Sequence, residues 1–302
     1  MNPETANLLQ RRVNELHNLP AMPTVLRSLG ECLGANPSDV NLERIVELIS
    51  YDKSLVAQCL RIANSAMFRR RAEVDSIRSA VMALGVSRIR DIVYSCALPG
   101  LLAGSKDGMA PVVFWRHALG TALVSQHLAQ RFEIENCEKF YLAGLLHDIG
   151  ILVNSLLFRE EFQRVLQEAE ASETPLFEVE ARILGFTHCD TGTILAGLWN
   201  LPADVSAAIE RHHHPMADHP NLEMICTVYL ADLLCRLRNL GYGYYEAREF
   251  DLAAAAPWRM LQEIHPAAAD IDLARFTLEL DEHAVSVQEL VDSIFTPEKT
   301  PA

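Results

Sequence analysis

Apolar residues recur at helical spacing along most of the chain, and this pattern predicts a protein built from helices. In residues 5–17, for example, Leu8, Leu9, Val13 and Leu16 fall on one face of a helix. No alternation of apolar and polar residues, the mark of a strand, persists beyond a few positions. We therefore expect an all-α fold. The same periodicity predicts further helices over about residues 112–132, 138–157, 159–171, 175–184, 221–239, 251–264 and 285–295.

Turn and capping residues divide the first third of the chain into short helices. Asp52 is expected to cap the helix that follows it, Gly85 to separate two helices, and Ser87 to cap the second of these. Residues 99–112 hold three glycines and two prolines, a composition typical of a domain boundary. We expect an N-terminal helical subdomain over residues 1–104, a second helical subdomain over residues 105–245 and a helical extension over residues 246–302.

The acidic balance of the chain limits its partners. Its 302 residues carry 26 Lys and Arg against 40 Asp and Glu, a formal net charge of −14. Nucleic acids and anionic membranes attract positive surfaces, so this charge argues against either as the main partner. The basic cluster Arg69–Arg71 is the local exception, and such charge runs are usually solvated surface.

Cysteine usage and the apolar runs indicate a cytoplasmic protein. Seven cysteines are scattered without a C-x-x-C pair, which is typical of reduced thiols inside a core. Cys189 is interpreted as such a core residue. The first residues lack the apolar stretch of a signal peptide, and no apolar run approaches the about 20 residues that span a bilayer.

Side chains that bind metals gather inside apolar helices of the second half. His117 stands beside Ala118 and Leu119, and Asp232 stands beside Leu233. A buried carboxylate without a partner costs several kcal/mol or is neutralised by a pKa shift, and a metal ion removes that cost. The candidate ligands are His117, His147, Asp148, His188, His212, His213 and Asp232.

The chemistry of this set points to transition metals. Imidazole and carboxylate without thiolate suit iron, manganese, zinc or nickel. An aspartate has two oxygens and can bridge two ions, as in two-metal sites that act on phosphoryl groups. Each residue also has a simpler interpretation, and Asp232 could be the buried partner of an arginine. The histidines interpreted as ordinary hydrogen-bonded or solvent-facing groups are His17, His127, His214, His219, His265 and His283.

The order H…HD…H…HH…D on consecutive helices resembles the HD superfamily of metal-dependent phosphohydrolases. The resemblance implies a helical HD-type bundle in which His117, the His147–Asp148 pair and Asp232 bind metal. His188 and His212–His213 resemble the extra positions of dinuclear members, including the HD-GYP phosphodiesterases. Two transition-metal ions are therefore implied, iron or manganese ahead of zinc or nickel.

Motifs in the first half resemble the HDOD family, the HD-related output domains of bacteria. The stretches are "LPAMPTVLRSL", "DKSLVAQCLRIANSAMF" and "DSIRSAVMALGVSRIRDIV", and the resemblance covers about residues 15–240. It implies a regulatory role in signal transduction through a partner protein. The matching positions are Leu19, Pro20, Pro23, Asp52, Leu60, Arg61, Ala63, Asn64, Ser65, Ser76, Ile77, Ala80, Leu84 and Gly85.

Two departures bear on catalysis. Ile151 stands where catalytic HD-GYP proteins read lysine, in H-D-I-G-K, and that cation would contact a substrate phosphate. The stretch "HHHPMADHP" also lacks their D-G-x-G-Y-P sequence. We therefore expect a cytoplasmic bacterial signalling module with a retained, dinuclear metal site.

Two alternatives stay open. One is a metal-dependent phosphohydrolase or phosphodiesterase that acts on a nucleotide or cyclic nucleotide, with Asp148 as the catalytic metal bridge. The other is a helical protein with scattered polar core residues and no metal. No oligomeric state follows from the sequence.

Overall fold

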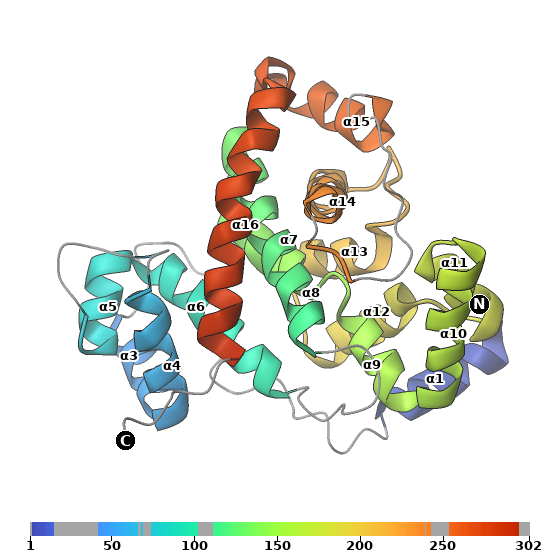
Figure 1. Cartoon of the computed structure of the whole chain (residues 1–302), viewed down its shortest axis with the longest axis horizontal. Coiled ribbons are helices and arrows are strands. Elements are labelled where there is room, and N and C mark those ends of the chain that lie inside the picture. The colour runs from blue at the N-terminus through green and yellow to red at the C-terminus, as the bar shows by residue number, and fades with distance from the viewer. Residues whose placement is uncertain are drawn as a thin grey trace. The chain divides into compact units, whose positions relative to one another are not determined.

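The computed structural model describes residues 2–14, 42–65, 68, 74–101, 111–238, 240–242 and 254–295. Every regular element among these residues is a helix and none is a strand, which confirms the all-α fold (Figure 1). The helices of the first part are α1 (Pro3–Asn14), α3 (Leu42–Ser50), α4 (Lys53–Ala63), α5 (Ile77–Leu84) and α6 (Val86–Leu101). Those of the second part are α7 (Pro111–Arg131), α8 (Glu138–Leu146), α9 (Ile149–Leu157), α10 (Arg159–Ser172), α11 (Leu176–Ile183), α12 (His188–Leu198), α13 (Ala203–Arg211), α14 (Leu222–Leu237), α15 (Ala256–Ile264), the 3-10 helix η4 (Pro266–Asp270) and α16 (Leu273–Phe295).

The chain divides into two units. Unit 1 comprises residues 1–18 and 104–284, and unit 2 comprises residues 19–103 and 285–302. The expected subdomain boundaries at residues 104/105 and 245/246 lie outside the described residues. The same is true of Leu19, Pro20, Pro23, His17 and the cluster Arg69–Arg71.

Caps and a glycine shape unit 2 locally. Asp52 accepts hydrogen bonds from the backbone N–H groups of Ser54 (2.9 Å) and Leu55 (3.1 Å), which confirms it as the cap of α4. Gly85 ends α5 with a φ of 85°, a left-handed conformation that glycine adopts without strain. Because α6 begins directly after it, Ser87 lies inside α6, and its expected role as a cap is wrong.

A side-chain clamp joins the two ends of the segment between α4 and α5. The amide of Asn64 donates to the backbone carbonyl of Val74 (2.8 Å) and accepts from its N–H (2.9 Å). Ser76 then caps α5 by accepting from the N–H of Ser79. Asn64 and Ser76, which belong to the HDOD-like motifs, therefore act by hydrogen bonding to backbone groups at the start of α5 and just before it.

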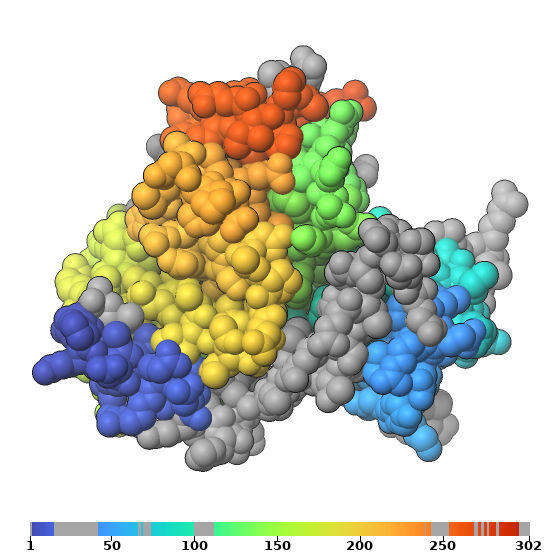
Figure 2. Space-filling model, turned by 180° about the vertical axis from the view of Figure 1, so that it is seen from behind, coloured from blue at the N-terminus to red at the C-terminus, as the bar shows by residue number. Residues whose placement is uncertain are grey.

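Unit 1 is centred on α14, which packs against α7, α8, α13 and α15. Figure 1 shows α14 between α13 and α15. Helix α12 packs on α9 and α13, and α1 lies against α12 on the face seen in Figure 2. Helices from different parts of the sequence thus meet around the turn that joins α8 to α9.

The segment expected to form one helix over residues 138–157 forms two. His147 ends α8, and Asp148, with φ −105° and ψ 14°, leaves helical geometry before α9 begins. Apolar residues on both sides hide this break in the sequence. Residues 138–157 are long and apolar enough for a membrane span, contrary to the expectation that no run comes close, but 89% of their most apolar stretch is buried. Such burial fits a segment of the core.

Two glycines beside this turn permit unusually close helix contacts. A Cβ on Gly144 would lie 2.6 Å from the backbone oxygen of Thr121 on α7. A Cβ on Gly150 would lie 1.9 Å from the backbone oxygen of His188 on α12. Neither site has room for a side chain, so these glycines fix the distance from the α8–α9 turn to its neighbours.

The last helix is longer than expected. Periodicity predicts a helix over residues 285–295, whereas α16 runs from Leu273 to Phe295. The side chain of Asp272 accepts from the N–H of Arg275 (3.1 Å) and so begins the helix earlier.

Candidate metal centre

The seven candidate ligands come from five helices and turns of unit 1. His117 lies on α7, the His147–Asp148 pair joins α8 to α9, and Asp232 lies on α14. His188 begins α12, and His212–His213 follow α13. All except His213 are at most 4% exposed. Polar groups buried this deeply need partners.

Asp148 is the point on which the histidines converge. Its Oδ1 lies 3.1 Å from the Nε2 atoms of both His188 and His212. Its Oδ2 lies 3.1 Å from Nε2 of His147 and 4.0 Å from Nε2 of His117. The two oxygens of one carboxylate therefore face two different pairs of imidazoles.

Backbone carbonyls orient three of these rings. Nδ1 of His117 donates to the carbonyl of Leu240 (2.9 Å), Nδ1 of His147 to that of Gly144 (2.7 Å), and Nδ1 of His212 to that of Ala208 (3.0 Å). A carbonyl only accepts, so the proton is on Nδ1. In the neutral imidazole the lone pair of Nε2 then points to the centre, as in metal-binding histidines.

Glu180 orients the fourth ring, and sequence reasoning missed it. This fully buried carboxylate accepts from both the backbone N–H (2.8 Å) and Nδ1 (2.6 Å) of His188. It also accepts from the amide of Asn154 (3.0 Å). The available signal was position, since Glu180 falls on the apolar face that Leu176 and Val179 form on α11.

His213 and Cys189 complete the side of the centre near Oδ1. Nε2 of His213 lies 3.0 Å from Nε2 of His188, and its ring stacks on Phe177. Sγ of Cys189 lies close enough to His188, His212 and His213 for the four residues to hold an ion together. Burial raises the pKa of this thiol, but the two imidazoles His212 and His188 bring it down to about 7. The interpretation of Cys189 as a core residue alone is therefore incomplete.

Asp232 is shared between the centre and an arginine. Its Oδ1 lies 3.1 Å from Nε2 of His117. One helical turn later, Arg236 donates to both carboxylate oxygens of Asp232. The negative charge of Asp232 is thus already compensated, and both interpretations of this residue have a geometric basis.

The residues fit a metal ion. Burial lowers the pKa of His147 to about 4, so its imidazole is neutral, and its Nε2 has no hydrogen-bond partner. Although burial raises the pKa of Asp148, the surrounding imidazoles hold it well below its usual range, and the pKa of His188 and that of His212, on the Oδ1 side, are raised in spite of burial. A lone pair of His147 therefore faces an anionic oxygen at 3.1 Å, which is repulsive unless a cation lies between them. Ligand atoms about 2.1 Å from one ion are about 3 Å apart when they meet at a right angle.

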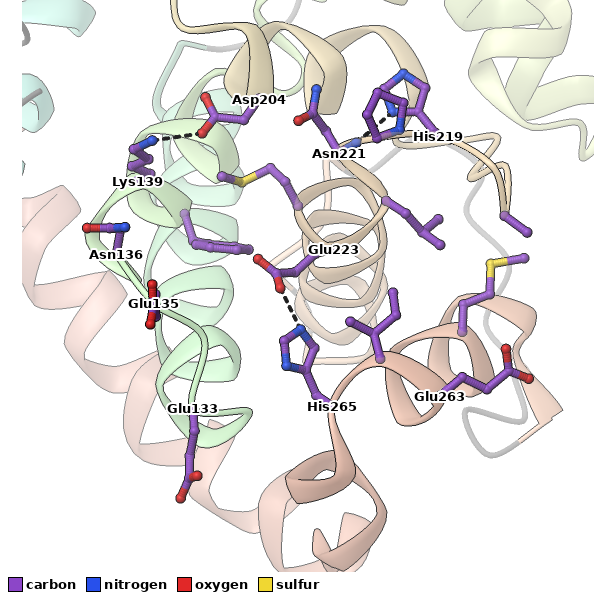
Figure 3. A pocket seen from close by; sticks show the side chains of 17 residues that line it. Glu133, Glu135, Asn136, Lys139, Asp204, His219, Asn221, Glu223, Glu263 and His265 are labelled. Atoms are coloured by element: carbon purple, nitrogen blue, oxygen red, sulfur yellow. Dashed lines mark hydrogen bonds and ion pairs between the residues drawn. The ribbon is translucent and has the colours of Figure 1, made fainter.

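A separate polar hollow of unit 1 also gathers histidines and acids. This α14–α15 pocket, of about 760 Å³, is lined by residues that include Lys139, Asp204, Glu223 and His265 (Figure 3). His265 pairs with Glu223 (2.5 Å), and Lys139 pairs with Asp204 (3.1 Å). None of the lining residues is one of the seven candidate ligands described above, which together we call the His–Asp centre.

Comparison with known proteins identifies the fold and the family. A solved HDOD domain protein of unknown function from Geobacter sulfurreducens is 26% identical and has a TM-score of 0.84, with 98% of this chain and 100% of that chain covered. A solved candidate phosphohydrolase from Shewanella amazonensis SB2B is 23% identical, with a TM-score of 0.73 and 95% and 97% of the two chains covered. The likeness to the Shewanella protein shows a shared fold only.

Comparisons of sequence lead to the same family as the comparison with solved structures. An uncharacterized protein of Treponema pallidum (strain Nichols) is 27% identical over 245 residues, which are 80% of this chain and 47% of that protein. The chain thus spans less than half the length of this curated relative. The HDOD domain family matches residues 19–215, which confirms the resemblance seen in the motifs. This chain belongs to the HDOD family.

Proposed function

We propose that this protein is a cytoplasmic regulatory module of bacterial signal transduction that acts through contacts with a partner protein. In this proposal the His–Asp centre binds two transition-metal ions, iron or manganese, in a structural or sensory role. Membership of the HDOD family and the histidine-rich groups that could bind metal support it.

The observation that carries this proposal is the burial of the centre. A phosphohydrolase must bring a phosphate to its metal ions. Here Asp148 is 4% exposed and the four imidazoles nearest to it are at most 1% exposed. Ile151, at the position of the lysine in catalytic relatives, is 0% exposed and packs in the core. A buried centre of this kind is better suited to holding helices together than to binding a phosphoester.

The division of ligands around Asp148 supports two ions rather than one. His117 and His147 lie near Oδ2, while His188 and His212 lie near Oδ1. A single ion would leave one of these pairs without a cation.

Metal analysis tests this proposal. Protein purified from its native host is expected to hold about two equivalents of transition metal, and Asp148→Ala well under one. Asp204→Ala, which removes an acid of the α14–α15 pocket, is the matched control and keeps the metal. Wild-type protein that holds well under one equivalent, even after reconstitution, would contradict the metal centre.

A metal-dependent phosphohydrolase acting on a nucleotide or cyclic nucleotide is the second candidate. It is favoured by the edge of the centre, where His213 is half-buried and the side chain of Arg236 is 25% exposed. Arginine binds phosphate oxygens well. The Shewanella protein of the same fold, described as a candidate phosphohydrolase, gives this alternative further support.

Substrate turnover separates the two candidates. The metal-loaded protein is assayed with nucleotides, cyclic nucleotides and simple phosphodiesters in the presence of manganese or iron. The signalling proposal expects no turnover. Turnover that disappears in Asp148→Ala would overturn a purely regulatory role.

A further inference from the structure

A short segment after α14 is built onto the metal centre. The carbonyl of Leu240 accepts from Nδ1 of His117 (2.9 Å), and the carbonyl of Gly241 accepts from Arg116 (3.2 Å). The ring of Tyr242 stacks on Phe114 and lies 4.2 Å from the His117 ring, centroid to centroid. Three successive residues therefore dock on α7 beside a candidate ligand.

Tyr242 reaches the central carboxylate. Its hydroxyl donates to Oδ2 of Asp148 at 2.7 Å, and the residue is only 7% exposed. This is the oxygen that faces His147 and His117. The phenol oxygen thus lies beside the carboxylate oxygen that would hold an ion on this side of Asp148.

The charge balance on this side leaves a place for a second anion. Asp148 is shared with the histidines near Oδ1, and Arg236 compensates the charge of Asp232. The imidazoles of His117 and His147 are the other groups near Oδ2. An ion of charge 2+ or 3+ in a dry site is stabilised by anionic oxygen ligands. Tyr242 is the side chain placed to provide one.

We propose that Tyr242 is an oxygen ligand of the metal ion on the Oδ2 side of Asp148, and that it makes this side favour iron(III). On binding, the phenol O–H bond breaks, the proton passes to solvent and a bond forms between the phenolate and iron. Tyrosine serves iron in this way in other proteins. The inference rests on the proposed metal centre and adds a ligand to it.

The test is spectroscopic. Full-length protein is loaded with iron(III), its iron content is measured, and its visible absorption and resonance Raman spectra are recorded. A phenolate-to-iron(III) charge-transfer band is expected in the wild type and absent in Tyr242→Phe. The phenylalanine keeps the ring contacts with Phe114 and His117, so the variant is expected to fold, which circular dichroism checks.

Tyr94→Phe is the matched control, because Tyr94 is a buried tyrosine of α6 outside the centre. It is expected to keep the band. Tyr242→Phe is also expected to hold iron about 10- to 100-fold more weakly in a competition with a chelator.

The outcomes separate this inference from the proposed centre. Iron-loaded wild type without the band, or a band that persists in Tyr242→Phe, overturns the role of Tyr242 and leaves the centre intact. Wild type that takes up no iron or other transition metal overturns both.

Discussion

The His–Asp centre and the α14–α15 pocket use the same kinds of side chain in opposite ways. In the pocket, His265 has Glu223 as its neighbour and Asp204 has Lys139. In the centre, the Nδ1 atoms bind backbone carbonyls or Glu180, and the Nε2 atoms converge on one carboxylate. Histidines alone therefore do not mark a metal site. What distinguishes the centre is that four imidazoles face the two oxygens of one buried carboxylate.

The largest loss of stability and of bound metal is expected where the centre depends on close contact between backbones. Gly150→Ala would place a Cβ 1.9 Å from the carbonyl oxygen of His188, so α9 and α12 would have to separate. We expect a loss of at least about 3 kcal/mol in the free energy of unfolding, together with loss of bound metal. Denaturant unfolding and metal content measure the two effects.

Gly197→Ala is the matched control for this substitution. Gly197 lies in α12, the helix that Gly150 of α9 contacts, and a Cβ there would meet nothing within 4 Å. Alanine there is expected to stabilise the helix by about 0.5–1 kcal/mol. Equal destabilisation by the two substitutions would show that the close approach at Gly150 is not the cause of the loss.

An intermediate loss of stability and of metal affinity is expected when Glu180, the carboxylate that accepts from Nδ1 of His188, is replaced. Glutamine at position 180 offers one acceptor and an NH₂ donor, so Glu180→Gln leaves at least one of the buried donors of His188 or Asn154 unpaired. We expect about 1–3 kcal/mol lower stability and about 10- to 100-fold weaker metal binding.

Glu168→Gln serves as the control, because Glu168 pairs with Arg182 at the surface (3.0 Å). It is expected to change neither quantity measurably. Metal binding is measured by competition with a chelator. Stability is measured by denaturant unfolding of the protein after treatment with chelator, so that bound metal does not contribute. Unchanged metal affinity in Glu180→Gln would mean that His188 needs no orienting partner.

The smallest change in stability and metal content is expected for a substitution in the α14–α15 pocket. His265→Ala removes a partly exposed pair with Glu223 and is expected to cost no more than about 1 kcal/mol, with metal content unchanged. His212→Ala is the contrasting variant and is expected to lose metal. If His265→Ala also lost metal, the distinction between the pocket and the centre would fail.

Periodicity was sufficient for the fold because a buried helical face repeats every few residues along the chain. The helix expected over residues 159–171 and α10 agree almost residue for residue. The break at His147–Asp148 could not be predicted in this way, because apolar residues continue on both sides. The cap at Asp52 was predictable because it acts on its own neighbours.

The site was only partly visible in the sequence. His117, Asp148 and His212 were singled out by residue type and by resemblance to a family, and the structure brings their side chains together. Tyr242 was missed because its contact with Asp148 joins segments far apart in the chain. Glu180 lies only eight residues before His188 and was missed because an acidic residue on the apolar face of α11 was not followed up. Their assignment as part of a metal centre stays a proposal.

The contact at Gly150 has a thermodynamic consequence. Because the α9 backbone is seated directly on the His188 carbonyl, packing of the two helices already restrains Asp148 and His188 before any ion arrives. The conformational entropy of assembling these ligands is thus lost when the protein folds, and little of it remains to be lost on binding. The centre is preorganised, so in the proposed function most of the binding free energy would remain available to hold metal.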